Sequence, residues 1–151
     1  MLIRRMTEAD AGAVSALITR SYDQVLVHYH SPEMLARFRE HATPESLVEQ
    51  LGRKEFYVVE DQGRLIASGG LGWIGTERRV TDLFVAVDLI GRGVGRLLLD
   101  HLVSVAKDEG ARRLHVASVR NAVTFYERAG FVPDPDPPAA IPEITWLALD
   151  L

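Results

Sequence analysis

Hydrophobic and polar residues recur along the chain with two different spacings, which predict helices and strands in mixed order. Apolar residues three or four positions apart favour helices, and we expect these at about 8–21, from Pro32, from Thr43 to near Gly52, from 94 to Gly110, and at 122–129. Short apolar runs bounded by turn residues favour strands, and we expect these at 2–5, 56–59, 65–68, 79–87, 114–117 and 144–149.

The order of these elements indicates a mixed α/β (α+β) sheet. Residues 61–64 have the composition of a hairpin turn, which makes the strands on either side antiparallel. Strand 79–87, the long helix and strand 114–117 form a βαβ unit, whose two strands run parallel. A chain of 151 residues has the length of one domain, and we expect a single domain over 1–151.

Two segments have a distinct pattern within this order. The long helix is amphipathic, and its spacing assigns one face to the core: Val94, Leu97, Leu98, Leu102, Val105 and Ala106. Five of the seven prolines lie between Pro133 and Pro142. Proline cannot donate a hydrogen bond to a sheet or continue a helix, so we expect a loop or an edge connection there.

Composition narrows the classes of protein that the pattern allows. Hydrophobic residues make up 47% of the chain and charged residues 25%, which is typical of a soluble globular protein. The formal net charge of −4 argues against a nucleic-acid binder. No apolar run suits a membrane span or a signal peptide, so we expect a cytoplasmic protein without membrane contact. The absence of cysteine excludes disulfides, cysteine-ligated metals and an acyl-cysteine intermediate.

Gly91, Gly93 and Gly95 occupy alternate positions between strand 79–87 and the long helix. Glycines let the backbone turn several N–H groups toward one point, and the N-terminus of a helix adds unpaired donors and partial positive charge. Arg92 and Arg96 add two full charges. The segment is therefore predicted to bind phosphate.

Two common phosphate-binding motifs do not fit this segment. A Walker loop requires Gly-Lys-Ser/Thr, which the segment lacks. A Rossmann loop requires a third glycine where this chain has Arg96, and an acidic residue after the next strand, where it has Ala117 and Ser118. We therefore disfavour a dinucleotide-binding domain.

The glycine segment instead resembles the loop Arg/Gln-x-x-Gly-x-Gly/Ala of the GNAT acetyltransferase superfamily, which holds the pyrophosphate of acetyl-CoA. A second match begins 26 residues beyond Gly95, where Asn121, then Phe125-Tyr126, then Gly130-Phe131 resemble the signature that follows the loop in that family. One departure is Ile90, which occupies the family's Arg/Gln position, so that side-chain contact to the cofactor is missing.

The resemblance implies a central, mostly antiparallel mixed sheet with one parallel strand pair, flanked by helices. It implies direct transfer of an acetyl group from acetyl-CoA to a primary amine of a small molecule or peptide, with no metal. Dimers are frequent in the family, so a homodimer is an open alternative. The cofactor-binding residues that it implies are Phe84, Val85, Ala86, Val87, Gly91, Arg92, Gly93, Val94, Gly95, Arg96, Asn121 and Phe125.

The resemblance also suggests catalytic roles. A backbone N–H of 84–86 is expected to polarise the thioester carbonyl, where the strand bulges away from its parallel neighbour. Tyr126 matches the family's tyrosine and can donate a proton to the leaving thiolate, the alternative being that it only packs its helix onto the sheet. Asp82 and Glu77 are the candidate general bases for the amine, and a base acting through water is the alternative.

The acceptor site is expected near a polar cluster, His28-Tyr29-His30, because the segment between the first two helices commonly lines the acceptor pocket in this family. Trp73 is a further candidate at its border. No third ligand with metal-binding spacing follows the two histidines, so we expect no metal. The acidic residues beside the proline-rich segment, Asp134, Asp136 and Glu143, could attract a cationic amine.

A GNAT-fold module that binds acyl-CoA without catalysis and regulates another protein is the alternative function. Ile90 and the open choice of base are the two features that keep this alternative open beside the enzyme.

Overall fold

Neighbouring side chains in the central strands enter two separate hydrophobic layers, one on each face of the sheet. In the computed structural model, which describes all residues 1–151, Val58 packs with the first helices of the chain. Its neighbour Val59 packs on the other face with Val94 and Leu98 of the long helix. This alternation is the geometry of a strand with both faces covered, and it confirms the predicted mixed α/β class.

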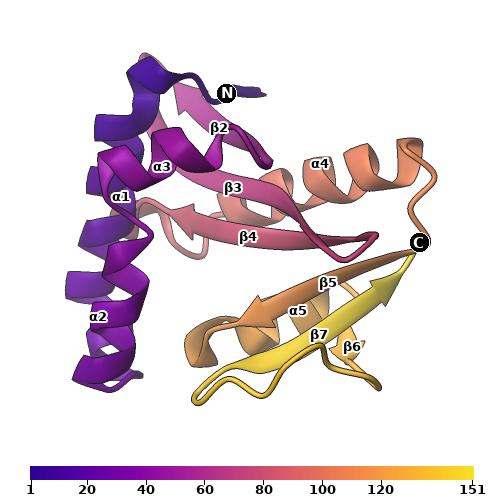
Figure 1. Cartoon of the computed structure of the whole chain (residues 1–151). Coiled ribbons are helices and arrows are strands. Elements are labelled where there is room, and N and C mark those ends of the chain that lie inside the picture. The colour runs from indigo at the N-terminus through magenta and orange to yellow at the C-terminus, as the bar shows by residue number, and fades with distance from the viewer.

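The elements follow the predicted order with one short strand added. The strands are β1 (Leu2–Arg5), β2 (Glu55–Asp61), β3 (Arg64–Ile74), β4 (Glu77–Val85), β5 (Arg113–Ser118), β6 (Val132–Pro133) and β7 (Thr145–Asp150). The α-helices are α1 (Ala11–Gln24), α2 (Pro32–Glu40), α3 (Pro44–Gln50), α4 (Val94–Asp108) and α5 (Val123–Arg128). Short 3₁₀ turns are η1 (Glu8–Asp10), η2 (Leu26–His28), η3 (Val87–Leu89) and η4 (Arg120–Ala122). Helices α1 to α3 cover one face of the sheet, and α4 and α5 cover the other (Figure 1).

The strands form one sheet in the order β1-β2-β3-β4-β5-β7-β6. All neighbours are antiparallel except β4 and β5, which run parallel as the βαβ order predicts. This parallel pairing is short, because it ends where Val80 faces Val116. Beyond these residues the two strands diverge toward the side of α1 and α2 (Figure 1).

β4 carries a bulge where it leaves β5. Asp82 and Leu83 of β4 both oppose Gly69 of β3. Asp82 has a left-handed φ of +52°, which is strained for a residue with a side chain. Gly69 leaves no room for one, because a Cβ there would lie 2.9 Å from Leu83 Cδ1. Bulges bend the strand that carries them, so this one helps to turn the end of β4 away from β5.

Three expectations about element boundaries and faces need correction. β4 ends at Val85, because Val87 already belongs to the 3₁₀ turn η3. β3 continues to Ile74 through glycines, which add no apolar side chains to signal a strand. Leu97 is 40% exposed and Leu99 is fully buried. Successive helix residues point about 100° apart, and Leu97 falls just outside the buried stripe.

The proline-rich segment contributes an edge strand and a loop. Val132–Pro133 pairs with β7, and the residues between β6 and β7 form no further helix or strand. None of the helices combines the length and apolar character needed to cross a lipid bilayer.

Candidate active site

A groove of about 640 Å³ opens where β4 and β5 separate, a size that suits a small ligand. Its lining includes both strands beyond their last paired residues, together with parts of α1, α2 and α5. The charged and hydroxyl-bearing side chains that line it are Tyr22, Arg37, Arg53, Lys54, Arg79, Thr81, Asp82, Ser118 and Tyr126. Two of the predicted catalytic residues, Asp82 and Tyr126, therefore border the same cavity.

Tyr126 lies on α5, on the sheet face that α4 and α5 cover, and its side chain lines the groove. Its buried ring packs against Phe125 and Phe131, with centroids 5.1 and 5.5 Å away. Burial, together with the charge of Asp82, raises the pKa of Tyr126 well above its usual value. The phenol therefore keeps its proton at neutral pH and remains able to donate it.

Asp82 is the only carboxylate that lines the groove, and it is held by Lys54 from the turn before β2. Lys54 Nζ lies 2.8 Å from Asp82 Oδ2 and donates to Thr81 Oγ1 at 3.1 Å. Glu77, the other predicted base, lies at the start of β4 and outside the groove, with Oε2 3.2 Å from His115 Nε2. The structure thus brings only one of the two candidate bases to Tyr126.

The backbone of β4 also presents a donor to the gap. Ala86 N–H donates to the Ile66 carbonyl at 2.8 Å, so it is already used and points toward β3. Because amide directions alternate along a strand, Phe84 N–H points the same way and Val85 N–H points away from β3. Of the three amides expected to polarise a carbonyl, Val85 is the one directed to the side that β5 has left.

The glycine segment forms the N-terminus of α4. Gly91 and Gly93 have φ of +82° and +85°, which require glycine because a side chain disfavours that backbone. Gly93 caps α4 without a side-chain hydrogen bond, and the amides of 94–96 find no acceptor in the chain. Arg92 is exposed and forms no ion pair, whereas Arg96 Nε lies 2.9 Å from Asp100 Oδ1. The segment therefore offers free N–H donors and one uncommitted charge, which suits a phosphate.

The helix terminus and the groove are joined by close packing. A Cβ on Gly95 would lie 3.2 Å from Val85 Cγ2 and 3.3 Å from Phe125 Cε1, so α4, β4 and α5 meet at this glycine. The side chains of Ala86 and Val94 are buried, which leaves only their backbone to meet a ligand. Asn121, on η4, and Ile90, just before Gly91, are both exposed.

The histidine cluster separates into exposed and buried members. His28 and Tyr29 are exposed and do not line the groove. His30 is buried, and its Nε2 accepts from the Arg120 backbone N–H at 3.2 Å, so Nδ1 carries the proton and donates to Glu143 Oε1 at 3.2 Å. Burial lowers the pKa of His30, against the opposing effect of Glu143. This histidine ties the loop before α2 to the end of the proline-rich segment.

Trp73 does line the groove, as expected of a residue bordering the acceptor. It is half exposed, and its ring lies over the buried guanidinium of Arg78, 4.0 Å from the ring centroid. Arg78 pairs with Glu55 and with Glu109, the residue that follows α4. The Trp73 ring therefore lies at the rim of the groove against a side chain that is itself fixed by two ion pairs.

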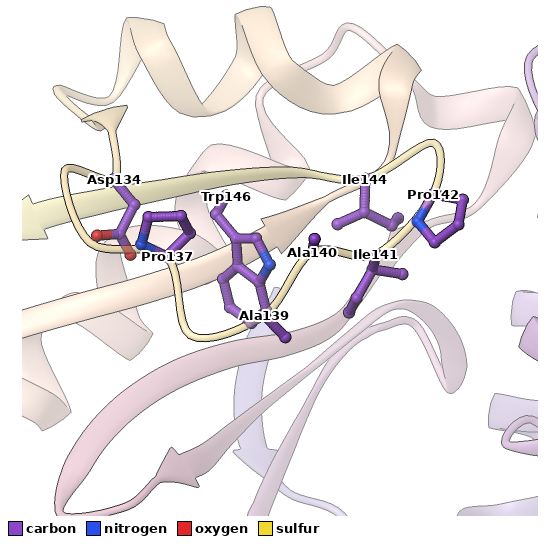
Figure 2. A pocket seen from close by; sticks show the side chains of 8 residues that line it. All are labelled: Asp134, Pro137, Ala139, Ala140, Ile141, Pro142, Ile144 and Trp146. Carbon is purple, nitrogen blue, oxygen red and sulfur yellow. The ribbon is translucent and has the colours of Figure 1, made fainter.

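A second cavity of about 490 Å³ lies under the proline-rich segment (Figure 2). Figure 2 shows the Trp146 ring in its middle, with Asp134 at one end and Ile141 and Ile144 toward the other. Ile141 and Ile144 line the groove as well, so these two side chains form the partition between the cavities.

Sequence reasoning passed over Lys54 and Arg79, which the structure places in the groove. Lys54 carries one signal, as one of only two lysines in the chain. Arg79 carries another, as a charge inside a predicted strand. Neither signal reveals that Lys54 contacts Asp82 in the bulge of β4 or that Arg79 lines the groove.

Comparisons with known proteins agree with this geometry. A family model described as Acetyltransferase (GNAT) domain matches residues 19–147. The chain is similar to the structure of the PaiA N-acetyltransferase of Thermoplasma acidophilum in complex with coenzyme A, with TM-score 0.86 and 16% identity over 99% of this chain and 98% of that one. It is also similar to a GNAT-family acetyltransferase of Staphylococcus aureus, with TM-score 0.78 and 13% identity over 99% and 98% of the two chains. A Mycobacterium tuberculosis protein in complex with CoA gives TM-score 0.74 and 18% identity over 100% and 99%.

Proposed function

Because this chain belongs to the GNAT acetyltransferase family, we propose that it transfers the acetyl group of acetyl-CoA directly to a primary amine of a small molecule or peptide. The observation that carries the proposal is the place of Tyr126, whose protonated phenol borders the groove where β4 leaves β5. The free amides of α4 approach the same gap through the contact of Gly95 with Val85 and Phe125.

The residues of the glycine segment fit the pyrophosphate of the cofactor. The uncapped amides of 94–96 and the unpaired Arg92 supply donors and positive charge without help from Ile90. Acetyl-CoA itself supplies the acetyl group as a thioester. The Val85 N–H, directed into the gap, would donate to the carbonyl oxygen as negative charge develops there.

The acceptor amine must lose a proton before it attacks. A primary amine with a pKa of ~10.4 needs roughly 4.6 kcal/mol to become neutral at pH 7. Apolar walls such as Leu26 and Phe38 disfavour the ammonium form. Asp82 would accept the proton, directly or through water, since it is the only carboxylate in the groove.

Tyr126 would act at the other end of the reaction. The cofactor's sulfur leaves with negative charge, and a buried phenol beside it can donate a proton. The chain has no cysteine that could carry the acetyl group, which favours direct transfer over an acyl-cysteine intermediate.

Thermal unfolding with coenzyme A and a thiol-release assay with a panel of amines test this function. CoA should raise the melting temperature, and the shift should shrink in Arg92→Gln but not in Arg64→Gln, whose arginine pairs with Asp88 on the surface. Free thiol should appear with at least one amine. A CoA-dependent shift without turnover on any amine would favour the non-catalytic module, and no shift at millimolar CoA would overturn both functions.

A further inference from the structure

The charges that line the groove are unequal in number. Four cationic side chains border it, those of Arg37, Arg53, Lys54 and Arg79, against the single carboxylate of Asp82. Lys54 forms an ion pair with Asp82 at 2.8 Å. Arg53 forms one at 2.9 Å with Glu49, which does not line the groove. Two arginines, Arg37 and Arg79, therefore face the groove without an acidic partner.

Arg79 is the more informative of the two, because it is partly buried and stands inside a strand. It stands on β4 opposite His115, one residue before the parallel pairing ends. Its guanidinium lies over the ring of Trp146, 5.4 Å from the centroid, and its buried Nε has no hydrogen-bond partner. Arg79 is partly buried, and a cation that is withdrawn from water without a counterion is costly unless a ligand pairs with it.

The acidic residues beside the proline-rich segment do not compensate this charge. Asp134 Oδ2 lies 2.7 Å from His115 Nδ1, and Glu143 accepts from Ser31 N–H at 2.8 Å. Neither carboxylate lines the groove. Asp136 is exposed and does not line the groove either. The placement of the three acids therefore gives no support to the expectation that they attract a cationic amine to the groove.

We propose that the acceptor is an amine that also carries a carboxylate, and that Arg79 binds this carboxylate. The proposal rests on the proposed function and names its substrate class. Guanidinium presents parallel N–H donors that match a carboxylate in a two-bond geometry. Arg79 precedes the bulge at Asp82 by three residues on β4, and both side chains line the same groove. One small molecule in the groove can therefore present its carboxylate to Arg79 and its amine toward Asp82.

The same charges disfavour the opposite class of acceptor. A polyamine would bring further cations into a groove that already holds two unpaired arginines, and like charges repel strongly where water is partly excluded. The apolar side chains of the groove would contact the uncharged part of such a molecule.

The test compares free amino acids with their α-carboxamides as acceptors, since each pair differs only at the carboxylate. The carboxamide's amino group is the less basic one, so preference for the free acid cannot arise from an easier loss of the proton. We expect at least one free acid to exceed its amide in kcat/KM, and Arg79→Gln to lower kcat/KM about 100-fold for that acid alone. Arg79→Lys should restore part of the loss, which shows that the site still folds. Arg113→Gln, on a surface arginine paired with Asp150, should match the wild type.

Each outcome separates the two proposals. The carboxylate site is wrong, while the transferase stands, if amides or polyamines are acetylated better than every free acid. The same conclusion follows if Arg79→Gln lowers kcat/KM equally for the free acids and for their amides. If no amine is acetylated, the binding of N-acetyl amino acids, measured by calorimetry, tests the carboxylate site by itself. Binding that is lost in Arg79→Gln supports the carboxylate site without the transferase, and no binding to the wild type overturns it.

Discussion

The ammonium of Lys54 lies 2.8 Å from the carboxylate of Asp82, and this ion pair joins the turn before β2 to the bulge in β4. Both side chains are mostly buried, with exposed fractions of 15% and 18%. Lys54 therefore fixes the direction of the carboxylate that we propose as proton acceptor. It also stabilises a residue whose own backbone is strained.

Kinetics of single and double variants test this pair. Asp82→Asn should lower kcat by about 100-fold, the usual scale for loss of a general base, with little change in KM for acetyl-CoA. Lys54→Met should lower kcat as well, because it leaves Asp82 unpaired and free to turn. In the double variant the two losses should not add, since Lys54 acts through Asp82. Additive losses would instead mean that Lys54 contacts the acceptor itself.

Tyr126→Phe separates chemistry from packing. The variant keeps the ring that packs between Phe125 and Phe131, so the melting temperature should stay within about 2 °C. It loses the proton donor, so kcat should fall by about 100-fold while KM for acetyl-CoA stays nearly constant. Because burial raises the pKa of Tyr126, the wild-type rate should show no loss from phenol ionisation up to about pH 10. Full activity of the variant would leave the tyrosine with a packing role alone.

Gly93→Ala tests the backbone of the phosphate-binding segment. A Cβ at this position meets nothing within 4 Å, so any cost comes from the φ of +85°. We expect a loss of about 1–2 kcal/mol in stability and weaker binding of coenzyme A, measured by thermal unfolding and calorimetry. Gly12→Ala in α1 is the matched control, since it too meets open space but has no positive φ. It should be neutral or stabilising, and equal behaviour of the two variants would contradict the argument.

The buried His30 makes stability depend on pH in a defined direction. Its pKa is lowered in the folded state, so below about pH 6.5 the unfolded chain binds a proton that the folded chain resists. The free energy of unfolding should therefore have its full value above about pH 6.5 and decrease as the pH drops below it. The pKa of Glu143 is lowered mainly by the Ser31 hydroxyl, so a further loss should follow below about pH 4.5.

Denaturant unfolding between pH 7 and 5 measures the histidine effect. His30→Gln keeps a donor and an acceptor but does not titrate, so its stability should vary less over this range than that of the wild type. His28→Gln, at the exposed neighbour, should keep the wild-type slope. Identical slopes for all three proteins would remove His30 as the source.

The sequence pattern anticipated most of the fold because helix and strand periods are local properties. The βαβ unit and the glycine segment predicted the parallel pair and the uncapped N-terminus of α4, and both are present. The predicted length of β3 is too short, since its glycines have no side chains that would add to the apolar pattern of a strand. Leu97 was assigned to the core because a stripe read from the sequence has no sharp edge, and only packing against the sheet selects Leu99 instead.

The site was less accessible from sequence, for a physical reason. Glu77 and Asp82 look alike as candidates along one strand, but parallel pairing stops at Val80, so only Asp82 reaches the gap. Lys54 and Arg79 enter the groove through contacts between segments far apart in the chain. The sequence predicts His30 as an acceptor-binding residue, and it does not reveal that the side chain is buried and bonded to Arg120 and Glu143.

The hydrogen bonds of Glu143 to Ser31 and His30 have a consequence for ligand binding in the groove. Five prolines between Pro133 and Pro142 restrict φ already in the unfolded chain, and Glu143 anchors the end of the segment to Ser31 and His30. We therefore expect the partition formed by Ile141 and Ile144 to be ordered before any acceptor arrives. A ligand entering the groove loses little binding free energy to freezing this wall, so selectivity between acceptors depends on contacts and charge and not on loop closure.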